Sequence, residues 1–93
     1  MTLQEILKQE LFITWTDEET EMRLARIIES AYSAMNHKLG VALDYETPSM
    51  EQNLFIQYCV YVYWGKANEF DDNYYHELAQ VRMFYEVEGY EEE

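Results

Sequence analysis

The chain has 93 residues and is 48% hydrophobic and 16% aromatic, which indicates one folded domain over residues 1–93 and excludes a disordered chain. Its three glycines and one proline leave few turns, which argues against an all-β fold. The formal net charge is −13, from 19 acidic and 6 basic residues. No cluster of Lys or Arg offsets this charge, so direct binding to nucleic acid is not expected.

The acidic charge is open to three interpretations. It can serve plain solubility, form a surface that repels DNA phosphate, or form a surface that imitates it. The net charge alone does not decide between them.

The first residues predict a short helix. Thr2 and Glu5 form a capping box, and apolar residues at helical spacing continue to an end near Leu11. The β-branched and aromatic residues 12–15 (FITW) then predict an extended connector. Acids interrupt the apolar pattern of this N-terminal segment, which lacks the apolar centre of a secretory signal, so we expect the protein in the cytoplasm.

A long helix is expected from Asp17 to Leu39. Thr16 is placed to cap it, with Glu19 closing a second capping box, and the acids of the first turn suit the positive end of the helix dipole. Apolar residues then recur at helical spacing. Gly40 follows as a residue that can adopt the left-handed conformation and end the helix.

The run Leu54–Trp64 (LFIQYCVYVYW) has ten apolar or aromatic residues out of eleven. As a helix it has no polar face, and its length of ~16 Å is too short to cross a bilayer. Ser49 and Gln52 form a capping box that favours a helix over Met50–Lys66. Residues 60–63 (VYVY) alone also fit a buried strand. Because a small domain leaves much of its surface exposed, we expect part of this run to meet another chain.

The last predicted helix covers Asp72–Tyr85. Asp71 or Asp72 can cap it, and Phe70 can pack against its first turn. Residues 87–93 are acidic and predict a flexible tail. The predicted fold class is therefore all-α, a small bundle of three long helices plus a short N-terminal helix.

The apolar faces of the predicted helices define an expected shared core. Truncating one of its large aliphatic residues, Ile28→Ala, is expected to cost about 2–5 kcal/mol. The expected core residues are Leu24, Ile27, Ile28, Ala31, Leu54, Tyr58 and Leu78.

Few residues offer chemistry. His37 and His76 lack the Glu three positions earlier that a di-iron helical bundle requires, and we interpret both as surface or boundary residues. Cys59 lies inside the apolar run and is interpreted as a buried, inert thiol. We therefore expect no enzymatic activity, no catalytic residues, no metal and no cofactor.

The aromatic residues exceed what one small core can hold. Tyr and Trp are favoured at interfaces, since each combines a large apolar area with a polar tip. The sequence therefore predicts a subunit interface, with Tyr61, Trp64, Tyr74 and Phe84 as candidates.

Three segments carry a wider resemblance: RIIESAYSAMNHKLG (Arg26–Gly40), NLFIQYCVYVYWGKANEFDDNY (Asn53–Tyr74) and ELAQVRMFYEVE (Glu77–Glu88). In this order they resemble the small head–tail connector, or head-completion, proteins of tailed phages and of the matching prophages of Gram-positive bacteria. The resemblance covers roughly Leu3 to Glu88.

This resemblance implies a helical domain that forms a ring of about a dozen subunits below the portal protein after DNA packaging. Such a ring extends the DNA channel and gives a tail or stopper protein a docking surface. It implies no enzymatic activity and no cofactor. DNA would pass through the channel without specific binding, and no membrane is involved. The expected location is the host cytoplasm during assembly, and then the head–tail junction of the virion.

Two other functions remain open. A small, acidic, Tyr-rich phage protein can act as a DNA mimic that inhibits a host DNA-binding protein. The continuous apolar run fits that role less well, because a mimic needs spaced surface carboxylates more than an apolar helix. A plain helical adaptor with an unknown partner is the third possibility.

Overall fold

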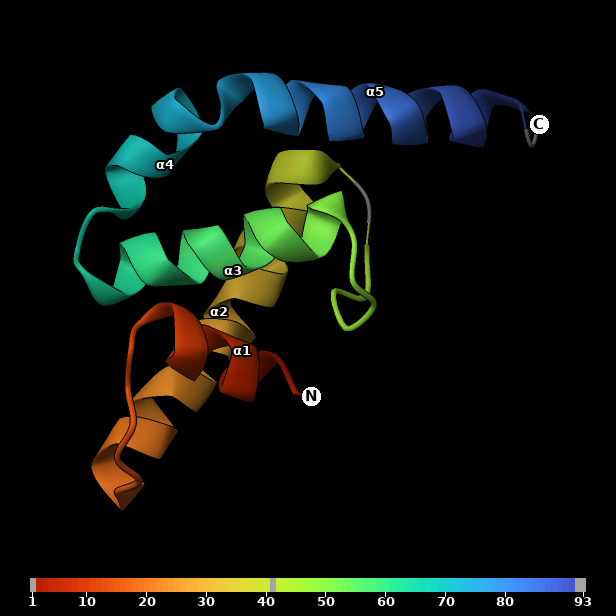
Figure 1. Cartoon of the computed structure of the whole chain (residues 1–93). Helices are drawn as coiled ribbons and strands as arrows, with labels where there is room; N and C mark the ends of the chain where they lie inside the picture. The colour runs from red at the N-terminus through yellow and green to blue at the C-terminus, as the bar shows by residue number, and fades with distance from the viewer. Residues whose placement is uncertain (1, 41, 92–93) are drawn as a thin grey trace.

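The computed structural model describes the backbone of residues 2–40 and 42–91, and the side chains of this part as far as Tyr85. This part of the chain folds into five helices without a strand (Figure 1). They are α1 (Leu3–Glu10), α2 (Glu18–Leu39), α3 (Met50–Tyr63), α4 (Ala67–Asn73) and α5 (Tyr75–Glu91). The all-helical prediction is confirmed, and the strand alternative for residues 60–63 is wrong.

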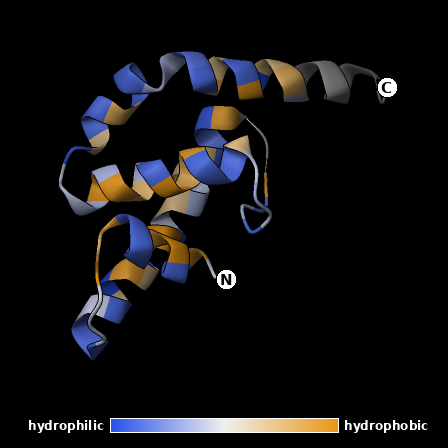
Figure 2. Cartoon of the chain, viewed as in Figure 1, coloured by the Kyte–Doolittle hydropathy of each residue, from blue (hydrophilic) through white to orange (hydrophobic). Residues whose placement is uncertain are grey.

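The helix α3 lies at the centre of the arrangement. It packs against each of the other four helices, whereas α1 packs only against α2 and α3. Figure 1 shows α5 running across the top of the molecule, joined to α3 through α4. The central position explains why α3 has no polar face, since neighbours approach it from several sides. Hydrophobic residues recur along α1 and α3 in Figure 2.

The ends of α1 and α2 show which capping predictions were correct. At α1, the Thr2 hydroxyl accepts from the Glu5 amide while the Thr2 amide donates to the Glu5 carboxylate, both at 3.1 Å. At α2, the prediction that Thr16 is the N-cap is wrong. Asp17 caps instead, and its carboxylate accepts from the amide (3.0 Å) and the hydroxyl (2.7 Å) of Thr20. A carboxylate that accepts two hydrogen bonds stabilises the start of a helix more than a hydroxyl does, because hydrogen bonds to a charged acceptor are stronger. The same two hydrogen bonds lower the pKa of Asp17.

Both ends of α3 differ in part from the prediction. The Ser49 hydroxyl accepts from the Gln52 amide, but the Gln52 side chain donates to the Tyr45 carbonyl instead of completing a capping box. The helix ends at Tyr63, three residues before the predicted end at Lys66. Gly65 has a φ of 75°, and the Lys66 amide donates to the Tyr61 carbonyl at 2.8 Å. This is a Schellman turn, which stops the helix.

The predicted start of the last helix is wrong. Asp71 and Asp72 lie inside α4, a helix that the sequence analysis did not separate, and α5 begins at Tyr75. Phe70 is fully buried in the middle of α4 rather than at the entrance of α5. Asp71 forms an ion pair with Lys38 at 2.7 Å instead of capping a helix. The burial of Phe70 in the core thus holds α4 in its position.

The backbone of α5 is helical as far as Glu91, beyond the predicted end at Tyr85. The sequence predicted a flexible tail over residues 87–93. The side chains of residues 87–91, and residues 92 and 93 as a whole, lie outside the described part of the chain. The flexible tail stays a prediction. α2 ends as expected, with Gly40 at a φ of 74°.

The core combines residues from all five helices with three from the segments between them, Leu11, Ile13 and Tyr45. Five of the predicted core residues are buried, whereas Ile28 and Tyr58 are half-buried at its edge. The unexpected member is Tyr45, whose ring stacks on Phe55 at 4.5 Å. Its hydroxyl donates to the Asn36 side chain at 2.8 Å, and burial raises its pKa.

Replacing Leu24 by Ala should lower the free energy of unfolding by about 2–5 kcal/mol, because Leu24 is fully buried. The matched change Ile28→Ala should cost less, about 1 kcal/mol, since Ile28 lies at an open hollow beside Leu3 and Ala25. This revises the larger cost expected from the sequence. Urea unfolding of both variants measures the difference, and equal costs would contradict the assigned burial.

A second prediction concerns Phe12, the residue after the C-cap of α1. It has a φ of 59° and is 85% exposed, while the Ile13 amide donates to the Lys8 carbonyl as in a Schellman turn. The left-handed conformation costs a residue with a side chain about 1–2 kcal/mol. Phe12→Gly should therefore stabilise the protein by about 0.5–1 kcal/mol after the loss of chain entropy is included.

The control is Phe12→Ala, which removes the ring but keeps a Cβ atom in the left-handed conformation. It should give no stabilisation in thermal or urea unfolding. If both variants were stabilised equally, the exposed ring and not the backbone would be the source of the effect.

Candidate interaction surface

The four predicted interface residues divide into two pairs. Tyr61 and Tyr74 are half-buried and pack against Phe70, Tyr74 stacking on it at 4.8 Å and Tyr61 meeting it edge-on at 5.7 Å. Trp64 and Phe84 are 61% and 60% exposed, Trp64 at the end of α3 and Phe84 on α5. The structure therefore joins Tyr61 and Tyr74 in one aromatic cluster and leaves Trp64 and Phe84 facing solvent in separate regions.

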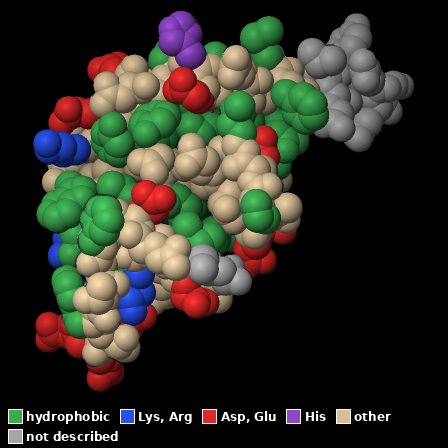
Figure 3. All heavy atoms as spheres, in the orientation of Figure 1, with side chains coloured by type: hydrophobic (Ala, Val, Ile, Leu, Met, Phe, Trp, Pro, Cys, Tyr) green, Lys and Arg blue, Asp and Glu red, His purple; other side chains and the backbone are tan. Residues whose placement is uncertain are grey.

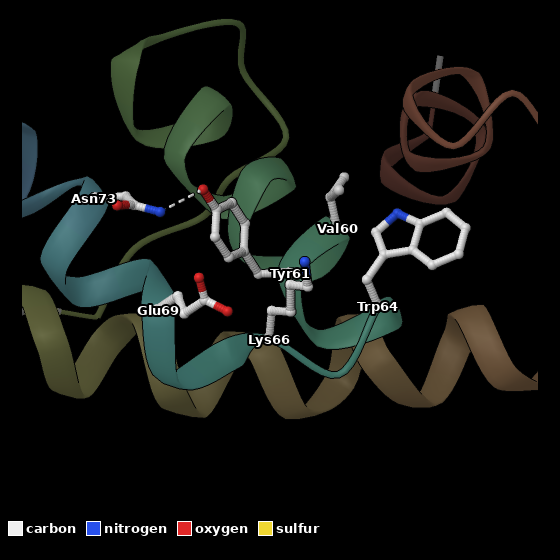
Figure 4. A pocket seen from close by; sticks show the side chains of 6 residues that line it. All are labelled: Val60, Tyr61, Trp64, Lys66, Glu69 and Asn73. Carbon is white, nitrogen blue, oxygen red and sulfur yellow. Dashed lines mark hydrogen bonds between the residues drawn. The ribbon is translucent and has the colours of Figure 1, made fainter.

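A hollow of about 280 Å³ opens between the end of α3 and α4. Figure 4 shows Trp64 and Asn73 on opposite sides of it, with Lys66 and Glu69 between them. The Asn73 amide donates to the Tyr61 hydroxyl at 3.0 Å, which fixes one wall. The hollow thus has an aromatic rim with one positive and one negative side chain.

Arg23 of α2 reaches the same end of α3. Its guanidinium lies 4.5 Å from the centre of the Tyr63 ring and donates to the Tyr63 carbonyl at 3.2 Å. Tyr63 in turn meets Trp64 edge-on at 5.0 Å. Arg26, one turn further along α2, lines a hollow together with Arg23. The contacts therefore connect α2 to the aromatic end of α3.

The other basic residues are occupied in holding helices together. Lys8 pairs with Glu21 at 2.8 Å and Lys38 pairs with Asp71. Arg82 donates twice to the Lys38 carbonyl in the last turn of α2, at 2.6 and 3.1 Å, which joins α5 to α2. Cations are favoured at this negative end of a helix.

Further apolar side chains are exposed that the sequence analysis did not single out. Figure 3 shows hydrophobic side chains at the surface of several helices and acidic side chains scattered among them. A signal for Met83 was available in the helical period, since Met83 lies about 200° around α5 from the buried Val81. The exposed large residues are Phe12, Trp15, Met22, Met50, Trp64, Tyr75, Met83 and Phe84.

The residues that could carry chemistry lie apart from this surface. His37 is exposed on α2 and His76 on α5, while Cys59 is fully buried in α3. Burial raises the pKa of the Cys59 thiol to about 12. Within the described residues, no group of three or more His, Cys, Asp or Glu is placed to hold a metal ion. None of the helices described is long and apolar enough to span a membrane.

Comparisons of the chain with protein-family models, with curated proteins and with solved structures each found no match.

Alkylation of Cys59 by iodoacetamide at pH 8 should be slower in the native protein than in urea by on the order of a thousandfold, because only the thiolate reacts and burial raises the pKa of the thiol to about 12. The control Cys59→Ala/Ser33→Cys places the thiol at an exposed position of α2 and should react at the same rate in both states. Rapid labelling of the native parent would contradict the burial of Cys59.

The same raised pKa gives a pH dependence. The stability due to the neutral thiol is complete below the ordinary thiol pKa and is lost as the pH rises towards about 12, because only the unfolded chain ionises in that range. Cys59→Ala should remove this part of the alkaline loss in urea unfolding.

Proposed function

We propose that the protein is a structural phage protein that forms a ring adaptor below the portal, joining head to tail and extending the DNA channel. The observation that carries the proposal is the exposure of large apolar side chains on two separate regions of one small domain. Trp64 is exposed at the end of α3, and Tyr75, Met83 and Phe84 are exposed on α5. Surfaces of this kind mark contacts with other chains.

Two separate surfaces favour a head-to-tail contact. A two-fold dimer uses the same patch on both subunits, whereas a head-to-tail contact joins two different patches and closes into a ring when the rotation allows. Trp64 directly follows α3, whereas Phe84 lies on α5, and both are exposed. Tyr61 and Tyr74 instead pack against each other and against Phe70 of α4. We propose that the first pair contributes directly to the interface and that the second supports the shape of the surface.

The net charge of −13 suits a channel protein. An acidic channel wall lets DNA slide, since it offers phosphate no cations to hold it. The partners are further copies of the chain, the portal protein and a tail or stopper protein. The protein acts in the host cytoplasm during assembly and then at the head–tail junction of the virion.

We propose no enzymatic activity and no cofactor. This accords with a thiol kept neutral by burial at Cys59 and with histidines exposed on different helices, His37 and His76. A structural role requires neither group.

The test is light scattering of the purified protein, alone and mixed with a portal ring. Assembly of the protein alone should be weak and should strengthen at high salt, because the charges of neighbouring copies repel one another and salt screens the repulsion to a few ångströms. Addition of the portal ring should produce a complex of defined mass. A protein that stays monomeric with the portal ring and instead captures a host DNA-binding protein would support the DNA-mimic alternative and overturn the ring.

Trp64→Glu tests the interface. The variant should unfold within about 0.5 kcal/mol of the parent, because Trp64 is exposed, and its assembly should weaken about tenfold or more. Met50→Glu is the matched control, since Met50 is an exposed apolar residue at the opposite end of α3 and should assemble normally. A folded Trp64→Glu variant that still forms rings would remove Trp64 from the interface.

A further inference from the structure

Half of the basic side chains of this acidic chain gather at one place. Arg23 lies over the Tyr63 ring, Arg26 shares a hollow with Arg23, and Lys66 follows Trp64 by two residues at the hollow beside α4. We name Arg23, Arg26, Tyr63, Trp64 and Lys66 the basic corner. The sequence gives no sign of it, because the three cations are separated by up to 43 positions.

Among the residues that the structure describes, no ion pair involves the cations of the basic corner, although Glu19 lines the hollow of Arg23 and Arg26 and Glu69 lines that of Lys66. In the described part of the molecule, the ion pairs join Lys8 to Glu21 and Lys38 to Asp71, and neither involves the corner. Arg23 donates only to a carbonyl, that of Tyr63. Arg26 and Lys66 are exposed. Positive charges beside an exposed Trp form a surface that complements an acidic segment with apolar residues.

The chain itself contains such a segment at its C-terminal end. Residues 86–93 (EVEGYEEE) have five Glu and no basic residue, together with Val87 and Tyr90. The backbone of α5 carries residues 86–91 of this segment away from the corner. The helix α4 begins directly after Lys66, and one residue separates it from α5. The 17 residues of α5 extend for roughly 25 Å. Figure 1 shows the end of α5 at the opposite side of the molecule from the turn between α3 and α4.

We propose that residues 86–93 of one copy bind the basic corner of the next copy. Residues 86–91 do not reach the corner of their own chain, because the length of α5 separates them from it. The contact is therefore made between two copies, and it joins two different surfaces, as a ring requires. This inference rests on the proposed function, since it names the two surfaces that meet in the assembly.

The test uses charge reversal in the full chain at one fixed ionic strength. The corner variant is Arg26→Glu/Lys66→Glu, which leaves Arg23 on Tyr63 and gives the corner a net charge of −1. The arm variant is Glu86→Lys/Glu88→Lys/Glu91→Lys, which gives residues 86–93 a net charge of +1. Sedimentation velocity measures assembly, with the portal ring present if the parent needs it. Each variant alone should assemble roughly tenfold or more weakly than the parent, because like charges then face each other.

Restoration of assembly is the decisive result. An equimolar mixture of the two variants should assemble, since each reversed surface then meets one of opposite charge. The variant that combines both sets of substitutions should also assemble, and its net charge is −11. The matched control combines the corner variant with Glu10→Lys/Glu29→Lys/Glu46→Lys at three exposed positions elsewhere. It has the same net charge and should stay defective.

The other outcomes are distinguishable. If the parent assembles and all variants assemble equally, the pairing is wrong while the ring remains. If the parent never assembles, with or without the portal ring, the proposed function and this inference both fail. The parent can also be mixed with duplex DNA in an electrophoretic shift experiment. If the parent shows a salt-sensitive shift that the corner variant loses, while that variant assembles normally, the corner binds phosphate and the pairing is wrong.

Discussion

The burial of α3 among the other four helices constrains every other part of this fold. A helix of 14 residues with four fully or nearly fully buried side chains, Leu54, Phe55, Ile56 and Cys59, needs apolar neighbours on several sides. In 93 residues these neighbours come from two helices that precede α3 and two that follow it. Burial is greatest from Leu54 to Cys59 and decreases towards Tyr63 and Trp64. The exposed aromatic end is thus a consequence of the small size of the domain.

Phe70 has a similar role on a smaller scale. Its ring lies against Tyr58, Tyr61 and Tyr74 at distances of 4.8 to 5.7 Å, and such ring contacts stabilise beyond the buried area alone. The cluster holds α4 against α3, and the turn between these helices then presents Lys66 beside Trp64. A buried aromatic residue therefore determines where a charged residue lies on the surface.

Local signals in the sequence were the most informative. Thr2, Ser49 and Gly40 were recognised because caps depend on residues within one turn of each other. Gly65 carried the same kind of signal, and extending α3 to Lys66 overlooked it. Thr16 and Asp17 are both good caps, and only the geometry around Thr20 decides between them. The separate helix α4 could not be predicted, since it exists because Phe70 is buried by residues distant in the sequence.

The candidate surface was less predictable than the fold. An excess of aromatic residues indicated that some would be exposed, but which ones depends on the helix crossings. Of the four residues predicted for the interface, Trp64 and Phe84 are exposed, whereas Tyr61 and Tyr74 are half-buried. Tyr45 shows the opposite case, because a loop residue became fully buried through its contacts with Phe55 and Asn36. The basic corner arises only when α2 and α3 cross.

The central place of α3 also bears on how the chain folds during synthesis. When α1 and α2 have left the ribosome, Leu7 and Leu24, which are fully buried in the finished domain, still lack the helix that covers them. Because α3 contacts the helices on both sides of it in the sequence, no cut divides the chain into two halves that each keep a core. The domain should therefore fold in one cooperative step only after α3 has emerged, rather than helix by helix.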